Sequence, residues 1–107
     1  MELKQYTVVL VNLDPTVGSE IQKTRPCVIL SPPQMIKHLN TIIVAPMTTA
    51  KKSYPTRIPI TFHAKSGFIA LDQIRTIDKS RIIKTFEVIS SARKKKVKGV
   101  LKEMLVD

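Results

Sequence analysis

The segment "YTVVLVNLDPTVGSEIQKTRPCVILSP" (residues 6–32) contains two short apolar runs joined by a polar loop. The first run, residues 6–13, is rich in Val and Leu and closes at turn-forming Asp, Pro and Gly residues. The second run, residues 27–31, is stopped by Pro32 and Pro33. Short runs that are rich in β-branched residues and bounded in this way are typical of strands. The segment therefore predicts two consecutive strands of a β-rich fold.

Four further runs of the same kind follow along the chain. They are rich in Ile, Val, Thr and Phe, are bounded by Pro, Gly, Ser or Lys, and are each expected to be a strand: residues 41–47, 57–62, 67–72 and 82–89. Pro59 has no N–H to donate inside a sheet. The strand over residues 57–62 is therefore expected at a sheet edge or at a bulge.

Two helices are expected among these strands. Residues 33–40 form a short one that begins with Pro33, because proline suits the first position of a helix. Ser90 or Ser91 can cap a longer C-terminal helix, in which apolar residues recur at helical spacing: Val97, Val100, Leu101, Met104 and Leu105. The pattern predicts a mainly β chain with appended helices (α+β): a small β-barrel with a C-terminal amphipathic helix, as a single domain over residues 1–107.

The chain is strongly basic. It contains 18 Lys and Arg against 8 Asp and Glu, a formal net charge of +10. Such an excess predicts a partner of negative charge: nucleic acid, an acidic protein or a membrane surface. The run "RKKKVK" (residues 93–98) contributes to this excess. It is either the solvated face of the C-terminal helix or a surface that attracts nucleic acid without reading its sequence.

A membrane is the least favoured of these partners. No apolar run approaches the roughly 18 residues that a spanning helix needs, and residues 1–15 lack the basic start and small-residue cleavage site of a secretory signal. Cys27 is the single cysteine, so no internal disulfide can form, and we expect it to be a small core hydrophobe. Together these features predict a reducing compartment and a cytoplasmic location.

The chain carries no recognisable metal or histidine-based site. His38 and His63 are its two histidines, and both are expected at the surface. No group of His, Cys, Asp and Glu has the spacing of metal ligands, and no histidine pair suggests a histidine-based ribonuclease. We therefore expect no metal and no cofactor.

The pair Arg25-Pro26 stands at the joint between the polar loop and the second apolar run. Proline restricts the residue before it to extended backbone. The backbone at Arg25 is therefore restricted, so its side chain points in a defined direction. An arginine that served only solubility would not need this restriction. The alternative is an ordinary solvated arginine in a loop.

Three blocks of the chain resemble the MazF/PemK/Kid family, the toxins of type II toxin–antitoxin pairs. The blocks occur in the family's order and at compatible spacing: "NLDPTVGSEIQKTRPCVILSP", "IIVAPMTTAKKSYP" and "GFIALDQIRTIDKSRI". With the C-terminal helix they span nearly the whole chain. The resemblance implies an SH3-like barrel with helices appended, a homodimer, and a ribosome-independent endoribonuclease that cuts single-stranded RNA at short motifs without a metal.

The resemblance also implies catalytic positions. The family's catalytic arginine stands in the "RP" pair, which is Arg25 here, and its catalytic threonine opens the "TT" pair, which is Thr48 here. In some members an aspartate in the last strand also takes part, and it matches Asp72. Those members carry an arginine two residues earlier, where this chain has Ala70. The segment Gln5-Tyr6-Thr7 departs as well, because many members begin the first strand with Arg-Gly-Asp.

Two loops are expected to contact RNA and to choose the bases at the cut. They are the loop between the first two strands and the segment "TTAKKSYP", and the candidate RNA-binding residues are Ser19, Glu20, Lys23, Thr24, Thr49, Lys51, Lys52 and Tyr54. Tyr54 stacks on a base or packs within its loop. Thr48 and Thr49 are also common strand-end residues.

The segment "QIRTID" (residues 73–78) has a structural interpretation. It predicts the end of a strand, a turn, and Asp78 as the cap of a short helix. Asp72 has a structural alternative to catalysis, in which it pairs with Arg75 or caps a turn.

RNA supplies its own nucleophile, the 2′-hydroxyl, so the enzyme has to align sugar and phosphate and stabilise charge on the phosphoryl oxygens. Arg25 offers a bidentate fork for this charge, and Thr48 adds a hydroxyl donor. The resemblance implies an acidic antitoxin partner. Two other functions remain open: a toxin of related fold that poisons DNA gyrase without catalysis, and an RNA-binding barrel that cuts nothing.

Overall fold

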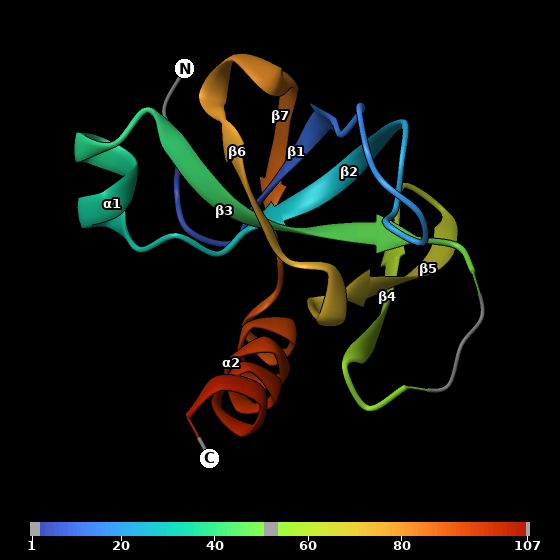
Figure 1. Cartoon of the computed structure of the whole chain (residues 1–107). Coiled ribbons are helices and arrows are strands. Elements are labelled where there is room, and N and C mark those ends of the chain that lie inside the picture. The colour runs from blue at the N-terminus through green and yellow to red at the C-terminus, as the bar shows by residue number, and fades with distance from the viewer. Residues whose placement is uncertain (1–2, 51–53, 107) are drawn as a thin grey trace.

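The computed structural model describes residues 3–50 and 54–106. Its elements follow the order β1 (Thr7–Asn12), β2 (Thr24–Ile29), α1 (Pro33–His38), β3 (Thr41–Thr48), β4 (Arg57–Phe62), β5 (Lys65–Ala70), η1 (Leu71–Gln73), β6 (Arg75–Asp78), η2 (Lys79–Arg81), β7 (Ile82–Val88) and α2 (Ser91–Leu105), as Figure 1 shows. The elements η1 and η2 are single turns of 3₁₀ helix.

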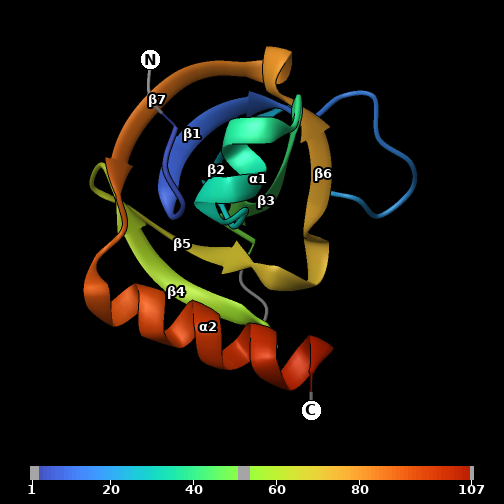
Figure 2. The same cartoon turned by 90° about the vertical axis from the view of Figure 1, so that its left-hand side faces the viewer.

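The strands form one antiparallel sheet that curls into a half-barrel. Their order is β4-β5-β3-β2-β1-β7, and β6 pairs with β3 beside this path. Figure 2 shows the sheet curled round, with α2 running beside β4. The predicted mainly β fold with a C-terminal helix is confirmed. The edge position expected from Pro59 is confirmed too, because β4 lies at one end of the strand order.

Strand β3 connects the two halves of the sheet. Its first half, from Thr41 to Val44, pairs with β6, the segment Val44–Pro46 pairs with β2, and its last two residues pair with β5. Burial follows this arrangement: it alternates at the start of β3 and becomes continuous toward Thr48. A strand covered on both faces has no need of polar residues on one side, which explains the apolar run over residues 42–47.

Both faces of β1 are buried, in two separate cores. Val8 packs in one core with Val97 of α2. Val9 and Val11 point to the other face and pack with Ile36 of α1. This two-sided burial explains why residues 7–11 are almost wholly apolar instead of alternating with polar residues.

The two α-helices begin where the sequence predicts. Pro33 opens α1, which ends at His38, two residues earlier than expected. The Ser90 Oγ accepts a hydrogen bond from the Arg93 N at 3.2 Å and caps α2. Four residues of the predicted apolar stripe pack on the body of the molecule: Val97, Val100, Leu101 and Met104. The prediction that Leu105 also belongs to the stripe was wrong, because this residue, in the last turn of α2, is 66% exposed.

Three local expectations need correction. Residues 75–78 form strand β6, not a turn, although Asp78 does cap the following 3₁₀ turn by accepting from Ser80 N. Asp72 lies in η1, after β5 has ended. Arg25 lies within β2 rather than in the loop before it.

Cys27 behaves as the small core residue that was expected. Its side chain is fully buried beside Val9 and Ile29. Burial raises the pKa of its thiol to about 12, and the charge of Arg75 lowers it by less. The thiol is therefore neutral at ordinary pH. Among the described residues, no helix has the length and apolar content to cross a membrane.

Candidate active site

A cavity of about 290 Å³ opens where β2 begins and β3 ends. Three parts of the chain line it: residues 23–26 of β2 and the loop before it, residues 47–49 at the end of β3, and the β4–β5 hairpin through Ile60, Phe62 and residues 65–67. Arg25 and Thr48, the first two catalytic candidates, both lie on its wall.

Strand register explains why Arg25 and Thr48 meet. Cys27 pairs with Pro46, and Val28 with Ala45, in the antiparallel ladder of β2 and β3. Continuing this register by two residues places Arg25 opposite Thr48. Opposite residues of an antiparallel pair project from the same face, which agrees with Arg25 and Thr48 lining one cavity from two neighbouring strands.

The side chain of Arg25 is anchored at one of its three nitrogens. Its Nε donates a hydrogen bond to the Gln22 carbonyl at 3.1 Å, and the residue is half-buried. Among the described residues this is the one hydrogen bond of the guanidinium, so Nη1 and Nη2 keep their N–H groups for a ligand. An arginine held in this way loses little side-chain entropy when it binds a phosphate.

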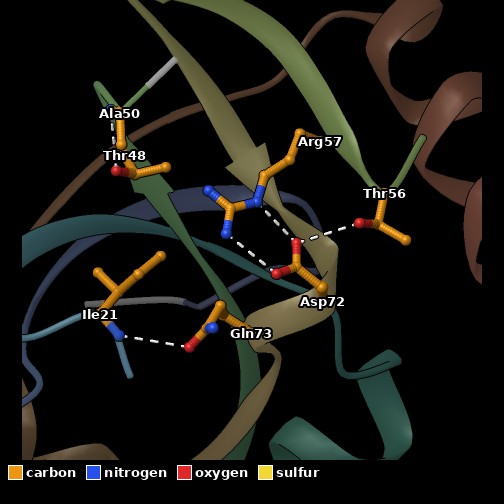
Figure 3. Close-up of polar contacts among 7 residues, drawn as sticks. All are labelled: Ile21, Thr48, Ala50, Thr56, Arg57, Asp72 and Gln73. Carbon is orange, nitrogen blue, oxygen red and sulfur yellow. Dashed lines mark hydrogen bonds and ion pairs between the residues drawn. The ribbon is translucent and has the colours of Figure 1, made fainter. Parts of the chain in front are cut away.

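The hydroxyl of Thr48 is buried and accepts a backbone hydrogen bond. The residue is 7% exposed, and its Oγ1 accepts a hydrogen bond from the Ala50 N at 3.1 Å (Figure 3). The backbone amide occupies one lone pair of the oxygen and leaves the hydroxyl proton to donate elsewhere.

Gly67 permits the close approach of β5 to this threonine. A Cβ built on Gly67 would lie 2.8 Å from the Thr48 carbonyl oxygen, which is closer than such contacts allow. Glycine inside a strand often marks the close approach of another backbone. The glycine that opens the segment "GFIALD" is the sequence signal for this close approach.

Asp72 does not line the cavity; it forms an ion pair with Arg57. The Nε and Nη2 atoms of Arg57 lie 2.7 and 3.0 Å from the two carboxylate oxygens, and Thr56 Oγ1 donates to Oδ1 at 3.2 Å (Figure 3). The pairing with Arg75 suggested by the sequence was wrong. Arg75 instead donates to the Leu13 carbonyl at 3.0 Å.

The ion pair shifts the titration of both partners. The hydrogen bond from Arg57 lowers the pKa of the Asp72 carboxyl against the opposing effect of burial. The same hydrogen bond raises the pKa of Arg57. The Arg57 guanidinium also lies 5.5 Å from the centre of the Tyr54 ring. Asp72 is therefore ionised at neutral pH and bound to its partners.

The turn η1 is connected to both loops that flank the cavity. Asp72 bonds to Thr56 and Arg57 at the start of β4. The next residue, Gln73, accepts a hydrogen bond through Oε1 from the Ile21 N at 3.3 Å, in the β1–β2 loop (Figure 3). Adjacent residues of one short turn thus bind two loops that are far apart in sequence. We call this feature the η1 clamp.

The candidate RNA-binding residues fall into three groups. Lys23, Thr24 and Thr49 line the cavity. Ser19, Glu20 and Tyr54 are exposed on the flanking loops and do not line it, and the Glu20 carboxylate accepts from Val17 N at 2.6 Å. Lys51 and Lys52 lie outside the described residues.

The apolar floor of the cavity and one of its rims were not predicted from the sequence. Met47, Ile60 and Phe62 form the floor, and Lys65 and Ser66 add polar groups from the β4–β5 hairpin. Met47 and Ile60 also belong to the main core, so their sequence pattern is that of ordinary core residues. Among the described residues, no cluster of three His, Cys, Asp or Glu could hold a metal ion.

The chain resembles known proteins along nearly its whole length. Residues 4–105 match the family model described as PemK-like, MazF-like toxin of type II toxin–antitoxin system. The Endoribonuclease MazF of Staphylococcus saprophyticus is 32% identical over 105 residues, with 92% of this chain and 88% of that protein covered. The Endoribonuclease toxin MazF of Escherichia coli K12 is 33% identical over 70 residues, a match to 65% of this chain that spans 63% of the relative.

Solved structures agree with these sequence matches. MazF from Deinococcus radiodurans superposes with a TM-score of 0.85 at 26% identity, with 96% of each chain covered. An endoribonuclease in complex with its cognate antitoxin, from a mycobacterial species, superposes with a TM-score of 0.81 at 18% identity, with 97% of this chain and 95% of that chain covered. The chain belongs to the PemK-like, MazF-like toxin family of type II toxin–antitoxin systems.

Proposed function

We propose that this protein is an endoribonuclease toxin that cuts single-stranded RNA at specific sequences. The observation that carries the proposal is the meeting of Arg25 and Thr48 in one cavity, in a chain whose relatives are named endoribonucleases. An anchored guanidinium and a hydroxyl donor on facing strands are suited to the oxygens of a phosphodiester.

In the proposed reaction the RNA's own 2′-oxygen attacks the adjacent phosphorus. The 2′-hydroxyl loses its proton as the new bond forms, the bond from phosphorus to the 5′-oxygen of the next nucleotide breaks, and that oxygen takes up a proton. The products therefore carry a 2′,3′-cyclic phosphate and a 5′-hydroxyl. Arg25 Nη atoms and the Thr48 hydroxyl stabilise the charge that develops on the phosphoryl oxygens. We assign Arg25 this role rather than proton transfer, because a guanidinium stays protonated in proteins. No step of this scheme requires a metal ion.

The cavity floor suits a nucleobase beside the cut. Its apolar surface comes from Met47, Ile60 and Phe62, with Lys23 and Lys65 on the rim. Small-molecule sites commonly combine an apolar lining with a few polar groups that set orientation. Base-paired RNA would be excluded, because its bases are stacked away from such a pocket.

Asp72 takes a positioning role in this proposal. Its carboxylate is bonded to Arg57 and Thr56, and it does not line the cavity. It would hold the start of β4, and with it the floor residue Ile60, at the correct distance from Arg25.

Restraint by an acidic antitoxin completes the proposal. A net charge of +10 favours an acidic partner, and solved relatives include MazE-MazF complexes from Deinococcus radiodurans. We place this toxin–antitoxin pair in the cytoplasm and expect the toxin to act as a homodimer, as the family resemblance implies.

The proposal is tested by incubating the purified protein with single-stranded RNA in EDTA. We expect discrete fragments with 2′,3′-cyclic phosphate ends, and no cleavage where the step carries a 2′-O-methyl group. An absolute requirement for Mg²⁺, or efficient cutting at a 2′-deoxy step, would contradict the mechanism. Intact RNA together with trapped DNA gyrase would favour the gyrase poison instead, and intact RNA that still binds would favour a non-catalytic barrel.

A further inference from the structure

A second and larger cavity, of about 880 Å³, lies between the N-terminal segment, α1, η2 and α2. Lysines make up half of its described lining: Lys4, Lys37, Lys79, Lys94 and Lys98. No Asp or Glu is among the described residues that line it. We call it the lysine cavity. Part of the net positive charge of the chain is therefore concentrated at this cavity.

Two of these lysines lie over the ring of Tyr6, whose backbone is held in place by two hydrogen bonds. Its backbone N donates to the Ile29 carbonyl at 2.7 Å, and its own carbonyl accepts from the Ile89 N at 3.0 Å. The ammonium groups of Lys94 and Lys98 each lie 5.9 Å from the centre of its ring. The ring face thus stabilises two like charges, one helical turn apart, that would otherwise repel each other. A ligand anion would relieve the same repulsion.

The lysine cavity is separate from the Arg25–Thr48 cavity. Arg25 pairs with Val11 near the end of β1, whereas Tyr6 precedes the start of that strand. Val11 stands five positions after Tyr6, which corresponds to about 17 Å along a strand. In Figure 1, α1, which lines the lysine cavity, lies at the left of the view, and the end of β3, which lines the Arg25–Thr48 cavity, lies at the right.

We propose that the lysine cavity binds the phosphate backbone of the RNA strand whose cleavage step occupies the Arg25–Thr48 cavity. This inference rests on the proposed endoribonuclease function. Ammonium groups neutralise phosphates without reading bases, and Tyr6 is only 8% exposed, so it offers no platform for stacking. A strand held at one cavity has a high effective concentration at the other. The lysine cavity therefore adds affinity for long RNA and contributes no sequence preference.

The test compares two pairs of lysines on the same helix. Lys94→Gln with Lys98→Gln removes two charges from the cavity, and Lys95→Gln with Lys96→Gln removes two from exposed positions that do not line it. Binding is measured with 2′-O-methyl RNA in two lengths: one that spans only the cut step and its neighbours, and one several times longer. Melting temperatures of both variants verify that they remain folded.

We expect the cavity pair to weaken binding of the long RNA several-fold and to leave the short RNA unchanged. The slope of log K against log salt should flatten by about 1.4 for two lost phosphate contacts on a single strand. Lys95→Gln with Lys96→Gln should change the affinity for long RNA and the salt slope much less. Equal effects from the two pairs, or none from the cavity pair, would overturn the proposal.

Two further outcomes would also overturn it. Loss of binding to polyglutamate, with RNA binding intact, would assign the cavity to an acidic protein segment. A changed sedimentation coefficient without RNA would assign it to an interface between copies of this chain. If no RNA is ever cut but long-RNA binding still depends on Lys94 and Lys98, the proposed function fails while this site stands.

Discussion

Arg25 is the residue on which the proposed chemistry depends most. Arg25→Ala should reduce the single-turnover cleavage rate by about 10²–10³, which corresponds to roughly 3–4 kcal/mol of transition-state stabilisation. Arg25→Lys keeps the charge but loses the planar fork, so it should recover only a small part of the rate. Cleavage of one labelled RNA, measured with enzyme in excess, gives this comparison.

The matched control for Arg25→Ala is Lys96→Ala, which removes one charge from an exposed position on α2. It should leave the cleavage rate nearly unchanged. Arg25 is half-buried in β2, so thermal melting has to be measured on the same preparations. Near wild-type cutting by Arg25→Ala would remove it from the active site. A much lower melting temperature would make it a structural residue.

Gly67 allows a second prediction at the scale of one residue. In Gly67→Ala the new Cβ would meet the Thr48 carbonyl oxygen at 2.8 Å. Because that atom belongs to the backbone, the strand pair has to shift, and we expect a loss of about 1–3 kcal/mol in the free energy of unfolding. Cleavage should fall as well, since Thr48 moves with its carbonyl. Urea unfolding and single-turnover cleavage measure the two effects.

Gly99 is the matched control for Gly67. A Cβ at Gly99 would have nothing within 4 Å, and the residue lies exposed within α2. Gly99→Ala should therefore stabilise the protein by about 0.5–1 kcal/mol through helix propensity, with cleavage unchanged. If Gly67→Ala and Gly99→Ala changed the free energy of unfolding equally, the close contact with the Thr48 carbonyl would not be the reason for glycine at position 67.

At the scale of one element, the η1 clamp sets the position of both loops beside the cavity. Gln73→Ala removes the acceptor for the Ile21 N and should release the β1–β2 loop. We expect a higher KM and a broader choice of cut sites, with a smaller effect on kcat. Mapping the 5′ ends of cleaved transcripts measures the choice of sites directly.

The control for Gln73→Ala is Gln5→Ala. Gln5 also bonds a distant backbone group, through Nε2 to the Leu30 carbonyl at 2.9 Å, but Leu30 follows β2 and does not belong to either loop held by the clamp. It should alter stability by a similar small amount and leave the cut sites unchanged. Unchanged cut sites in Gln73→Ala would contradict a role of the clamp in specificity.

The Asp72–Arg57 ion pair of the η1 clamp predicts that stability depends on pH. Arg57 lowers the pKa of Asp72 below its usual value, so ionised Asp72 stabilises the folded state. This contribution is fully present above the unfolded pKa of about 3.9 and is lost as pH falls through the lower folded value. The difference in unfolding free energy between wild type and Asp72→Asn should therefore be constant near neutral pH and shrink in acid. Urea unfolding across this range tests it, and a difference that grows in acid would contradict the sign.

The local pattern predicted most elements but not all their partners. Short apolar runs bounded by turn residues located β1 to β5 and β7, because strand propensity and turn chemistry act over neighbouring residues. Strand β6 was missed since its four residues include charged Arg75 and Asp78. It is a strand because β5 pairs with Met47 and Thr48 of β3, which leaves the start of β3, from Thr41 to Val44, to pair with β6.

At the scale of the whole molecule, charge should control partner binding. A net charge of +10 predicts that binding of both RNA and an acidic antitoxin weakens as salt rises. If the antitoxin covers the Arg25–Thr48 cavity, the two ligands compete. Fluorescence anisotropy of a labelled 2′-O-methyl RNA, titrated with purified antitoxin, should show displacement. Simultaneous and independent binding of both ligands would contradict a shared site.

The sequence by itself predicted the fold class and most of the strands, though not all of their ends, and its resemblance to the MazF/PemK/Kid family identified Arg25 and Thr48 as catalytic candidates. The strands and helices depend on short-range patterns, namely apolar runs, turn residues and a helix cap, whereas the two candidates come from sequence blocks that resemble the family. Only the tertiary structure decided which side chains meet. Arg25 of β2 and Thr48 of β3 line one cavity because the two strands lie side by side, and the turn η1 directs Asp72 to Arg57 and Gln73 to Ile21. Pairing across strands depends on register and sheet curvature, which involve residues distant in the chain and leave no signature in any one segment.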